Sequence, residues 1–383
     1  MPNFSGVWTL QEQFEAITEG NWTGISQFEL YAWGENVSGK LGLNDTIDRS
    51  SPIQVGSLTN WSQVSSREEH TTAITTSNQL YAWGSNGSGR LGDNSSTYKS
   101  SPVQIGALTN WSQVDAGGAF SAAVKTDGTL WAWGQGTLGQ LGDNTATTTS
   151  SPIQVGALTN WSQVSAGQTH SLAINSSGEL YAWGTNTTGE VGDNTTIGRS
   201  SPVQIGALTN WSQVSAGIEF SLAIKTDGTM WSWGSNLVGR LGLNETANKS
   251  SPVQIGALTN WSQVSGNRLQ SHAIKTDGTM WSWGYGTAGQ LGNNTAVTAE
   301  SSPVQIGSLT TWSQVVAGGY HGVAIKTDGT LWGWGYNFRG QVGDGLTVNL
   351  SSPVQIGSET NWSSVTAGKL HTVAVTQSRT GMS

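Results

Sequence analysis

The residues of this 383-residue chain best suited to acid–base or metal chemistry are its histidines, and most of them share one position in a repeat of about fifty residues. A neutral imidazole can accept a proton or bind a metal ion. The shared position is filled by His70, His170, His321 and His371, and by Phe120, Phe220 and Gln270 in the other copies. Because other side chains replace the imidazole and no aspartate is placed to orient it, the pattern predicts neither a catalytic nor a metal site.

Carboxylates also recur at one position, where each follows a Leu-Gly or Val-Gly pair. These residues are Asp93, Asp143, Asp193 and Asp344. Such a set could bind calcium, but an aspartate at the head of a loop more often accepts hydrogen bonds from its own backbone. We therefore expect a structural role, and the sequence leaves the calcium alternative open.

The segment from Gly34 to Lys40 contains most of a phosphate-binding loop. That motif needs a serine or threonine after the lysine and a helix after the loop. Leu41 follows instead, and no helical periodicity is present. The chain also has no cysteine, which excludes thiolate chemistry. The sequence thus predicts no cofactor and no enzymatic activity.

Tryptophan is the remaining chemically distinctive residue, and it occurs in two regular series. One series precedes glycine (Trp33, Trp83, Trp133, Trp183, Trp233, Trp283, Trp334), and the other opens a Trp-Ser pair (Trp61, Trp111, Trp161, Trp211, Trp261, Trp312, Trp362). Such rings could stack on carbohydrate, but their strict spacing and two-residue alternation predict a core position between repeats. The same expectation applies to Trp131, Trp231, Trp281 and Trp332.

The elements that must position these residues follow from a single repeat, residues 161 to 210. Alternating strands are expected at 161–164, 170–174, 180–183 and 202–205. Other copies carry Asp-Gly between the second and third strands, as at Asp127-Gly128, which predicts a hairpin with positive φ at both central residues. Seven units of four short antiparallel strands predict an all-β, seven-bladed β-propeller.

The two ends of the chain divide one repeat between them. A third-strand segment, 30–33, comes first, and first- and second-strand segments, 362–365 and 371–375, come last. We therefore expect one composite blade built from residues 362–378 and 29–60, which closes the ring by pairing N- and C-terminal strands. The predicted organisation is an N-terminal segment (1–28), one propeller (29–378) and a tail (379–383).

The N-terminal segment has the pattern of a short amphipathic helix. Thr9 and Glu12 fit a capping box, and Leu10, Phe14 and Ile17 fall on one helical face. We expect this apolar stripe to anchor the segment on the propeller or on a partner.

Composition limits the class of partner. The chain has a net charge of −8 and only 10% charged residues, which argues against nucleic-acid binding because a phosphate backbone requires a basic surface. No apolar run approaches the ~20 residues that span a bilayer, so membrane insertion is not expected.

The repeat resembles the regulator of chromosome condensation family. The matching residues are Ala166-Gly167-x-x-His170-Ser171, Gly178 to Gly184, and Gly189-x-x-Gly192, and the likeness covers residues 29 to 375. It implies a propeller fold; the namesake is an exchange factor for the small GTPase Ran that docks on nucleosomes. This chain lacks a long insertion and a basic tail. In addition, Phe4 to Gln13 is similar to the N-terminal segments of marine bacteriophage virion proteins with such repeats.

Sequence variation among the copies is concentrated in two of the four connections. The link to the next blade reads Gly-Ala-Leu-Thr-Asn in four copies, whereas the first-to-second and third-to-fourth loops differ from copy to copy. Antiparallel strands place the two varied loops on the same face, where recognition is expected. The candidate binding residues are Arg67, Glu68, Glu69, Phe120, Ile218, Glu219, Phe220, Arg268, Tyr285, Tyr320, Tyr336, Phe338, Arg339 and Lys369.

These observations predict a non-enzymatic recognition protein. The similarity of the N-terminal segment to virion proteins implies that the protein is a tail or capsid-surface component of a virion. A cytoplasmic location is the alternative. The N-terminal segment would bind other virion proteins, and the varied face would bind a host-surface glycan or protein. Neutral drift of the loops, a GTPase exchange factor and a propeller lyase remain alternatives.

Overall fold

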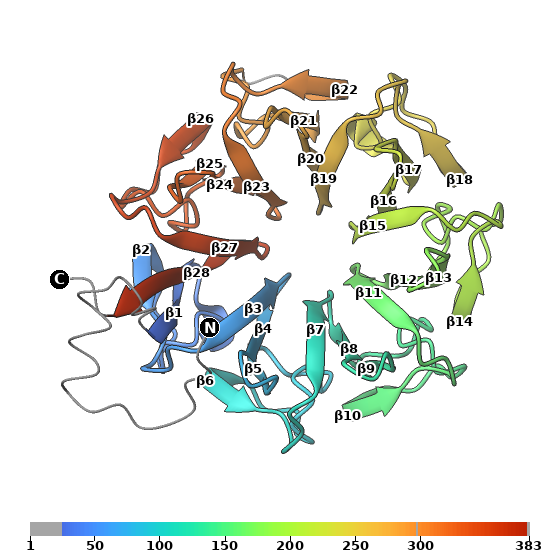
Figure 1. Ribbon diagram of the computed structural model, residues 1–383, viewed down its shortest axis with the longest axis horizontal. Coiled ribbons are helices and arrows are strands. Elements are labelled where there is room, and N and C mark those ends of the chain that lie inside the picture. Colours follow the sequence, from blue (N-terminus) through green and yellow to red (C-terminus); the bar gives the residue numbers. More distant parts are fainter. Residues whose placement is uncertain (1–24, 296–297, 381–383) are drawn as a thin grey trace, which may run out of the picture.

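The fold is a ring of seven four-stranded antiparallel sheets, seen in a computed structural model that describes residues 25–295 and 298–380 (Figure 1). The described residues form strands and two short 3-10 helices, η1 (Val37–Gly39) and η2 (Leu237–Gly239). The predicted seven-bladed propeller is therefore confirmed. The predicted N-terminal helix, with Leu10, Phe14 and Ile17, lies outside the described residues.

Six blades each use four consecutive strands, numbered here as blades 1 to 6. Blades 1 to 3 contain β3 (Trp61–Ser66), β4 (His70–Thr75), β5 (Leu80–Gly84), β6 (Lys99–Gln104); β7 (Trp111–Ala116), β8 (Phe120–Lys125), β9 (Leu130–Gly134), β10 (Thr149–Gln154); β11 (Trp161–Ala166), β12 (His170–Asn175), β13 (Leu180–Gly184), β14 (Arg199–Gln204). Blades 4 to 6 contain β15 (Trp211–Ala216), β16 (Phe220–Lys225), β17 (Met230–Gly234), β18 (Lys249–Gln254); β19 (Trp261–Gly266), β20 (Gln270–Lys275), β21 (Met280–Tyr285), β22 (Ala299–Gln305); β23 (Trp312–Ala317), β24 (His321–Lys326), β25 (Leu331–Gly335), β26 (Leu350–Gln355).

Blade 7 is the composite blade. It orders β2 (Arg49–Gln54), β1 (Ile25–Gly34), β28 (His371–Thr380) and β27 (Trp362–Ala367). β1 and β28 pair without interruption from Gly34↔His371 to Ile25↔Thr380, so the paired strands extend past the position expected for the propeller's start. The first and last described strands therefore belong to one sheet.

The Trp-Gly tryptophans hold neighbouring blades together. Trp183 on β13 is fully buried, and its indole N–H donates to the carbonyl of Gln140 in blade 2 at 2.9 Å. The Ser171 hydroxyl donates to the same carbonyl at 3.0 Å. Equivalent indole bonds recur at Trp33, Trp133, Trp233, Trp283 and Trp334, so the prediction that this series forms the core is confirmed.

The second-to-third hairpin differs from the predicted turn. Gly128 has φ +76°, whereas Asp127 is not among the positive-φ residues. The backbone N–H of Gly128 donates to the carbonyl of Lys125, and the N–H of Lys125 donates to the carbonyl of Thr129. This is a turn that ends in a left-handed glycine, so a single positive φ is sufficient and the expected pair was wrong.

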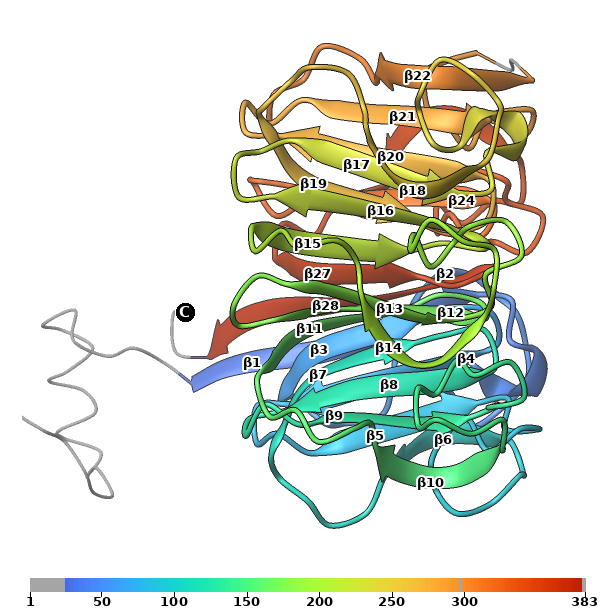
Figure 2. The ribbon, with the colours of Figure 1, turned by 90° about the vertical axis from the view of Figure 1, so that its right-hand side faces the viewer.

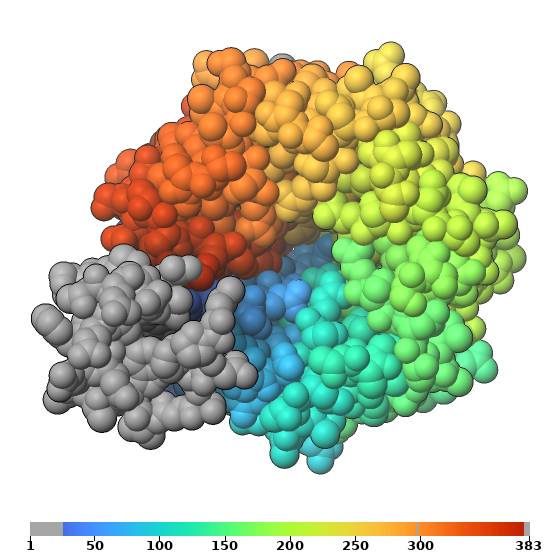
Figure 3. All heavy atoms as spheres, viewed as in Figure 1, coloured from blue at the N-terminus to red at the C-terminus, as the bar shows by residue number. Residues whose placement is uncertain are grey.

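The loops separate onto two faces. On one face, the N–H of Gln135 in a third-to-fourth connection donates to Ala119 in a first-to-second loop, at 2.9 Å. On the other face, the N–H of Thr126 in a hairpin donates to Asn110 in an inter-blade link, at 2.8 Å. We call the first the variable face and the second the constant face. Figure 2 shows the ends of β1 and β28 projecting from the constant face, and Figure 3 shows that this face is hollowed at the centre of the ring.

None of the helices in the described part of the chain is long and apolar enough to cross a membrane.

Candidate binding face

The predicted binding residues lie on the variable face, but they divide into buried, ion-paired and exposed groups. Phe120 and Phe220 are fully buried in two of the inter-blade cores. They are the first residues of β8 and β16, so their rings point between blades instead of into solvent. The expectation that these two phenylalanines face a ligand was wrong.

Arg67 and Glu68 cross the centre of the ring. The Arg67 guanidinium is buried and donates to the carbonyl of Ala216, at the end of β15 in blade 4. Glu68 is buried as well, and its carboxylate accepts from Arg268 in blade 5 at 3.1 Å. These two residues of blade 1 therefore connect blades on opposite sides of the ring, and they are not free to contact a partner.

Asp115 lies beside this connection and was not singled out from the sequence. Its carboxylate accepts from the Ser65 hydroxyl at 2.5 Å and from the Ala166 N–H at 2.7 Å. Burial raises the pKa of Asp115, and the nearby Arg67 charge opposes that rise. Asp115 occupies the position of Ser165, Ser215 and Ser265 in other copies. A carboxylate in place of a repeated serine is the sequence feature that indicates a special role for this residue.

Glu69 is held by Lys40, the lysine of the phosphate-loop-like segment. The Lys40 ammonium is fully buried and contacts Glu35 at 2.6 Å and Glu69 at 2.8 Å. Two carboxylates therefore occupy the hydrogen-bonding directions that a phosphate would use. The structural role predicted for this segment agrees with the geometry.

The remaining candidates in blades 4, 5 and 7 contact their neighbours singly. Glu219 is exposed, has φ +60° and lies 3.7 Å from the guanidinium of Arg240. The N–H of Ile218 donates to Asn267, and the N–H of Lys369 donates to Arg67, each at 2.7 Å. The half-buried Tyr285 extends β21 and pairs with Ala299. These four residues do not form one cluster.

An aromatic cluster forms where blade 6 meets its neighbours. The rings of Tyr320 and Tyr336 lie 5.9 Å apart, and those of Tyr336 and Phe338 lie 5.0 Å apart with an edge-on geometry. The Arg268 guanidinium stacks on Tyr320 at 5.1 Å. Phe338 is 63% exposed. Edge-on aromatic pairs and stacked arginines are typical interface anchors.

Charged groups border the cluster on the side of blade 7. The Arg339 side chain is 53% exposed and lies 3.3 Å from Asp48 and 3.6 Å from Glu35. We define the aromatic patch as Arg268, Tyr320, Tyr336, Phe338 and Arg339. It joins five of the predicted residues into one partly exposed surface with an apolar centre and a charged edge.

The histidines are structural. His70, His170, His272, His321 and His371 are all fully buried. The Nε2 atoms of His170 and His321 lie 3.0 and 2.8 Å from the hydroxyls of Ser221 and Thr372 in the next blade. Burial lowers the pKa of His170, His272 and His321 to about 3, and that of His70 and His371 well below its ordinary value. No cluster of three or more potential metal ligands occurs in the described part of the chain.

The recurrent loop aspartates bond locally. Asp93 accepts from the backbone N–H of Ser95 at 3.1 Å and from the Asn86 amide at 2.9 Å. Asp143 and Asp344 accept similarly from Thr145 and Leu346. These contacts are those expected of loop-capping residues.

Comparison with known proteins identifies the family to which the sequence belongs. The family model described as "RCC1-like domain" matches residues 29–316, and the one described as "Regulator of chromosome condensation (RCC1) repeat" matches residues 328–375. No curated protein sequence matches the chain significantly.

Solved structures share the fold at low sequence identity. Human WBSCR16 is 21% identical, with a TM-score of 0.82 over 91% of this chain and 98% of that one. Prp20p from Saccharomyces cerevisiae, a protein with binding properties to Gsp1p and histones, is 19% identical, with a TM-score of 0.83 over 99% and 97%. With the family model matching most of the chain, this protein belongs to the RCC1-like domain family.

Proposed function

We propose that this chain is a non-enzymatic recognition propeller that binds a macromolecular partner through the aromatic patch. The observation that carries the proposal is the clustering of Arg268, Tyr320, Tyr336 and Phe338, which come from two blades and from loops that differ between copies. Structural need alone does not explain a 63% exposed phenylalanine at a position that is threonine in other copies, such as Thr187.

We further propose that the protein is carried on a bacteriophage particle, as a tail or capsid-surface component, and binds a host-surface glycan or protein. The similarity of Phe4 to Gln13 to virion segments supports this location. The geometry is compatible with it, because β1 and β28 run out of the constant face and leave the variable face directed away from an attachment there. Mass spectrometry of purified particles tests it: the chain should be present after density-gradient purification, and its absence would remove the proposal.

A GTPase exchange factor is the second candidate, because the namesake of the family is an exchange factor for a small GTPase. Prp20p, which shares the fold, has binding properties to Gsp1p. A nucleotide-release assay across small GTPases separates the two functions. We expect the release rate to stay at its intrinsic value when this chain is added, and an acceleration would favour the second candidate.

Removing the aromatic patch should weaken partner binding without unfolding the protein. We expect the Tyr336→Ala/Phe338→Ala variant to bind its cell-surface partner at least about ten-fold more weakly, because anchor residues of this type each contribute more than about 1 kcal/mol. Cell-binding titration with the labelled chain gives the affinity, and thermal unfolding checks the fold.

Leu237 provides the matched control for that variant. It occupies the repeat position of Phe338, is 62% exposed and lies in blade 4, outside the patch. Leu237→Ala should leave the affinity unchanged. Equal losses in both variants would show that exposed apolar surface in general, and not this patch, carries the binding.

A further inference from the structure

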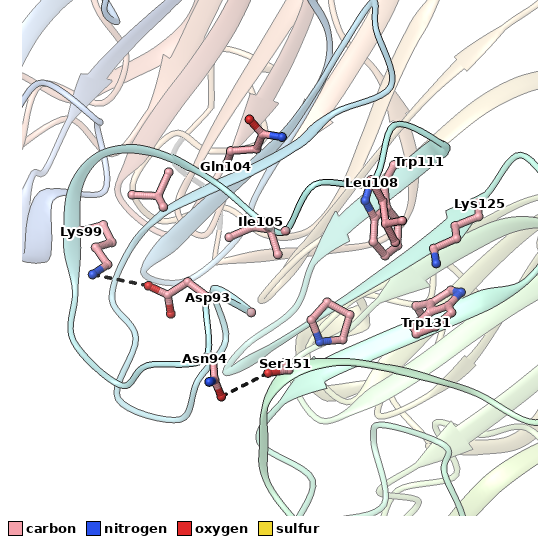
Figure 4. A pocket seen from close by; sticks show the side chains of 14 residues that line it. Asp93, Asn94, Lys99, Gln104, Ile105, Leu108, Trp111, Lys125, Trp131 and Ser151 are labelled. Atoms are coloured by element: carbon pink, nitrogen blue, oxygen red, sulfur yellow. Dashed lines mark hydrogen bonds and ion pairs between the residues drawn. The ribbon is translucent and has the colours of Figure 1, made fainter.

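The outer rim of the ring has a groove between blades 1 and 2, and the groove takes residues from both blades (Figure 4). It encloses ≈ 610 Å³. A second groove of ≈ 400 Å³ lies between blades 4 and 5, and it shares most of these positions, including Trp261 and Trp281, but Lys275 is not among its lining residues. Both volumes fall in the range of small-molecule sites. The same kind of groove therefore occurs at two of the blade junctions.

The groove has apolar walls and a tryptophan floor. Leu108, which is 50% exposed, forms part of the walls with Val103 and Pro152. Trp111 and Trp131 lie at the floor, with their ring centres 6.2 Å apart. Trp131 packs against the inter-blade core, as expected, but unlike the Trp-Gly series it is only partly buried. Its position at the edge of the inter-blade contact leaves part of the indole at the groove.

An ammonium group lies at this floor. Nζ of Lys125 is 3.6 Å from the ring centre of Trp131 and 4.9 Å from that of Trp111. The lysine is 6% exposed and lines the groove. Within residues 25–295 and 298–380, no acceptor forms a hydrogen bond or ion pair with this Nζ, whereas Lys99 at the edge of the groove is paired with Asp93. The Lys125 ammonium therefore retains N–H groups that a ligand can use.

The lysine and the tryptophan occur together within the chain. Lys125, Lys225, Lys275 and Lys326 accompany Trp131, Trp231, Trp281 and Trp332, each with Nζ 3.6 to 3.7 Å from the ring. The other three blades have tyrosine instead, with threonine or asparagine in place of lysine: Tyr31 with Thr376, Tyr81 with Thr75, and Tyr181 with Asn175. Since those three blades fold without the Lys–Trp pair, the propeller does not require it.

We propose that the Lys–Trp groove between blades 1 and 2 binds a pyranose, and that the other three Lys–Trp pairs provide equivalent sites. A pyranose has an apolar C–H surface, which fits the leucine and proline walls and the indole floor. It also has a border of oxygen atoms, one of which would accept a hydrogen bond from the lysine ammonium. The sites differ from the aromatic patch because they lie on the rim, and four of them on one ring would raise the avidity for a glycan-coated surface. The ligand is bound only, and no bond is made or broken.

The test uses the full chain and two simple probes. Methyl β-glucopyranoside is the neutral probe and methyl β-glucuronide the acidic one, each followed by saturation-transfer NMR and by calorimetric titration. We expect at least one to bind; preference for the glucuronide would identify a carboxylate as the acceptor of the lysine N–H. Failure of both to bind at millimolar concentrations would overturn the proposal.

The matched variant comes from the chain itself. Lys125→Thr/Trp131→Tyr gives blade 2 the pair that blade 1 has at Thr75 and Tyr81, and the same exchange can be made at the other three sites. Pyranoside binding should weaken about ten-fold or more, as expected for the loss of a charged hydrogen bond. The thermal unfolding midpoint checks that the fold is kept. Unchanged binding in the fourfold exchange would contradict the proposal.

The patch variant Tyr336→Ala/Phe338→Ala separates this inference from the proposed function. It should bind the pyranosides as the parent chain does, whatever its effect on the cell-surface partner. If the patch variant lost pyranoside binding while the rim exchange kept it, saccharide recognition would belong to the variable face and the rim proposal would fail.

Discussion

Acid should begin to destabilise this protein at a pH above that at which ordinary carboxylates titrate. Five histidines are buried and neutral in the folded ring, and burial places the pKa of His170, His272 and His321 at about 3. In the unfolded chain a histidine titrates near about 6.5. Below that pH the unfolded state therefore binds protons that the folded state does not, and stability falls as the pH falls.

The expected size of this loss follows from the pKa difference. At about pH 5, roughly 1.5 units below the unfolded value, each of these three histidines costs about 2 kcal/mol of unfolding free energy. His70 and His371, whose pKa values are also lowered by burial, add losses of the same sign. Asp115 has a raised pKa, so its protonation stabilises the folded state as the pH falls, but this single contribution opposes those of five histidines. Since domains are stable by only about 5–15 kcal/mol, unfolding should begin between about pH 6.5 and 4.

Urea unfolding at pH 7.5 and pH 5.0 measures the effect. His170→Gln is the matched control, because Gln270 occupies the same position in blade 5 and is fully buried. This variant should lose about 2 kcal/mol less than the parent chain between the two pH values. Equal unfolding free energies at pH 7.5 and 5.0 in the parent chain would refute the assignment of neutral buried histidines.

Removing the side-chain charge of Arg67 or of Asp115 should destabilise the fold by about 1–3 kcal/mol, because each group pairs with buried polar atoms. Both groups are buried, and each favours the charged form of the other. Loss of Asp115 leaves the Ser65 hydroxyl and the Ala166 N–H without this acceptor. Loss of Arg67 leaves the Ala216 carbonyl without this donor. Asp115→Ser introduces the residue found at this position in other copies, and Arg67→Met keeps much of the side-chain volume.

A double-mutant cycle isolates the coupling between the two groups. The Arg67→Met/Asp115→Ser variant should be destabilised by less than the sum of the single changes, by about 1–3 kcal/mol. Urea unfolding at pH 8, where histidine protonation is absent from both states, gives the three values. Strict additivity would show that the two charges act independently and that each single loss has another cause.

Sequence periodicity predicted the parts of this molecule that repeat. Two-residue alternation around each tryptophan located the strands, and the divided repeat at the two ends predicted the pairing of β1 with β28. Strand direction predicted that the varied loops share one face, and three of the predicted binding residues, Tyr320, Tyr336 and Phe338, form an aromatic cluster there.

The errors concern features that periodicity cannot locate. Phe120 and Phe220 were placed in loops, but each is the first residue of a strand, where one residue of shift turns a ring inward. Arg67 reaches Ala216 and Glu68 reaches Arg268, partners separated by 149 and 200 residues. A repeat predicts which blades are adjacent, and it carries no information about which side chains span the central opening.

The contacts across that opening change how the ring should come apart. In an array of repeats each unit contacts only its neighbours, so separation at one junction lets the array open stepwise. Here Arg67 and Glu68 also link blade 1 across the central opening to blades 4 and 5. Separation of two adjacent blades therefore leaves the contacts across the ring intact. Hydrogen exchange should report that blades 1, 4 and 5 open in one cooperative step instead of blade by blade.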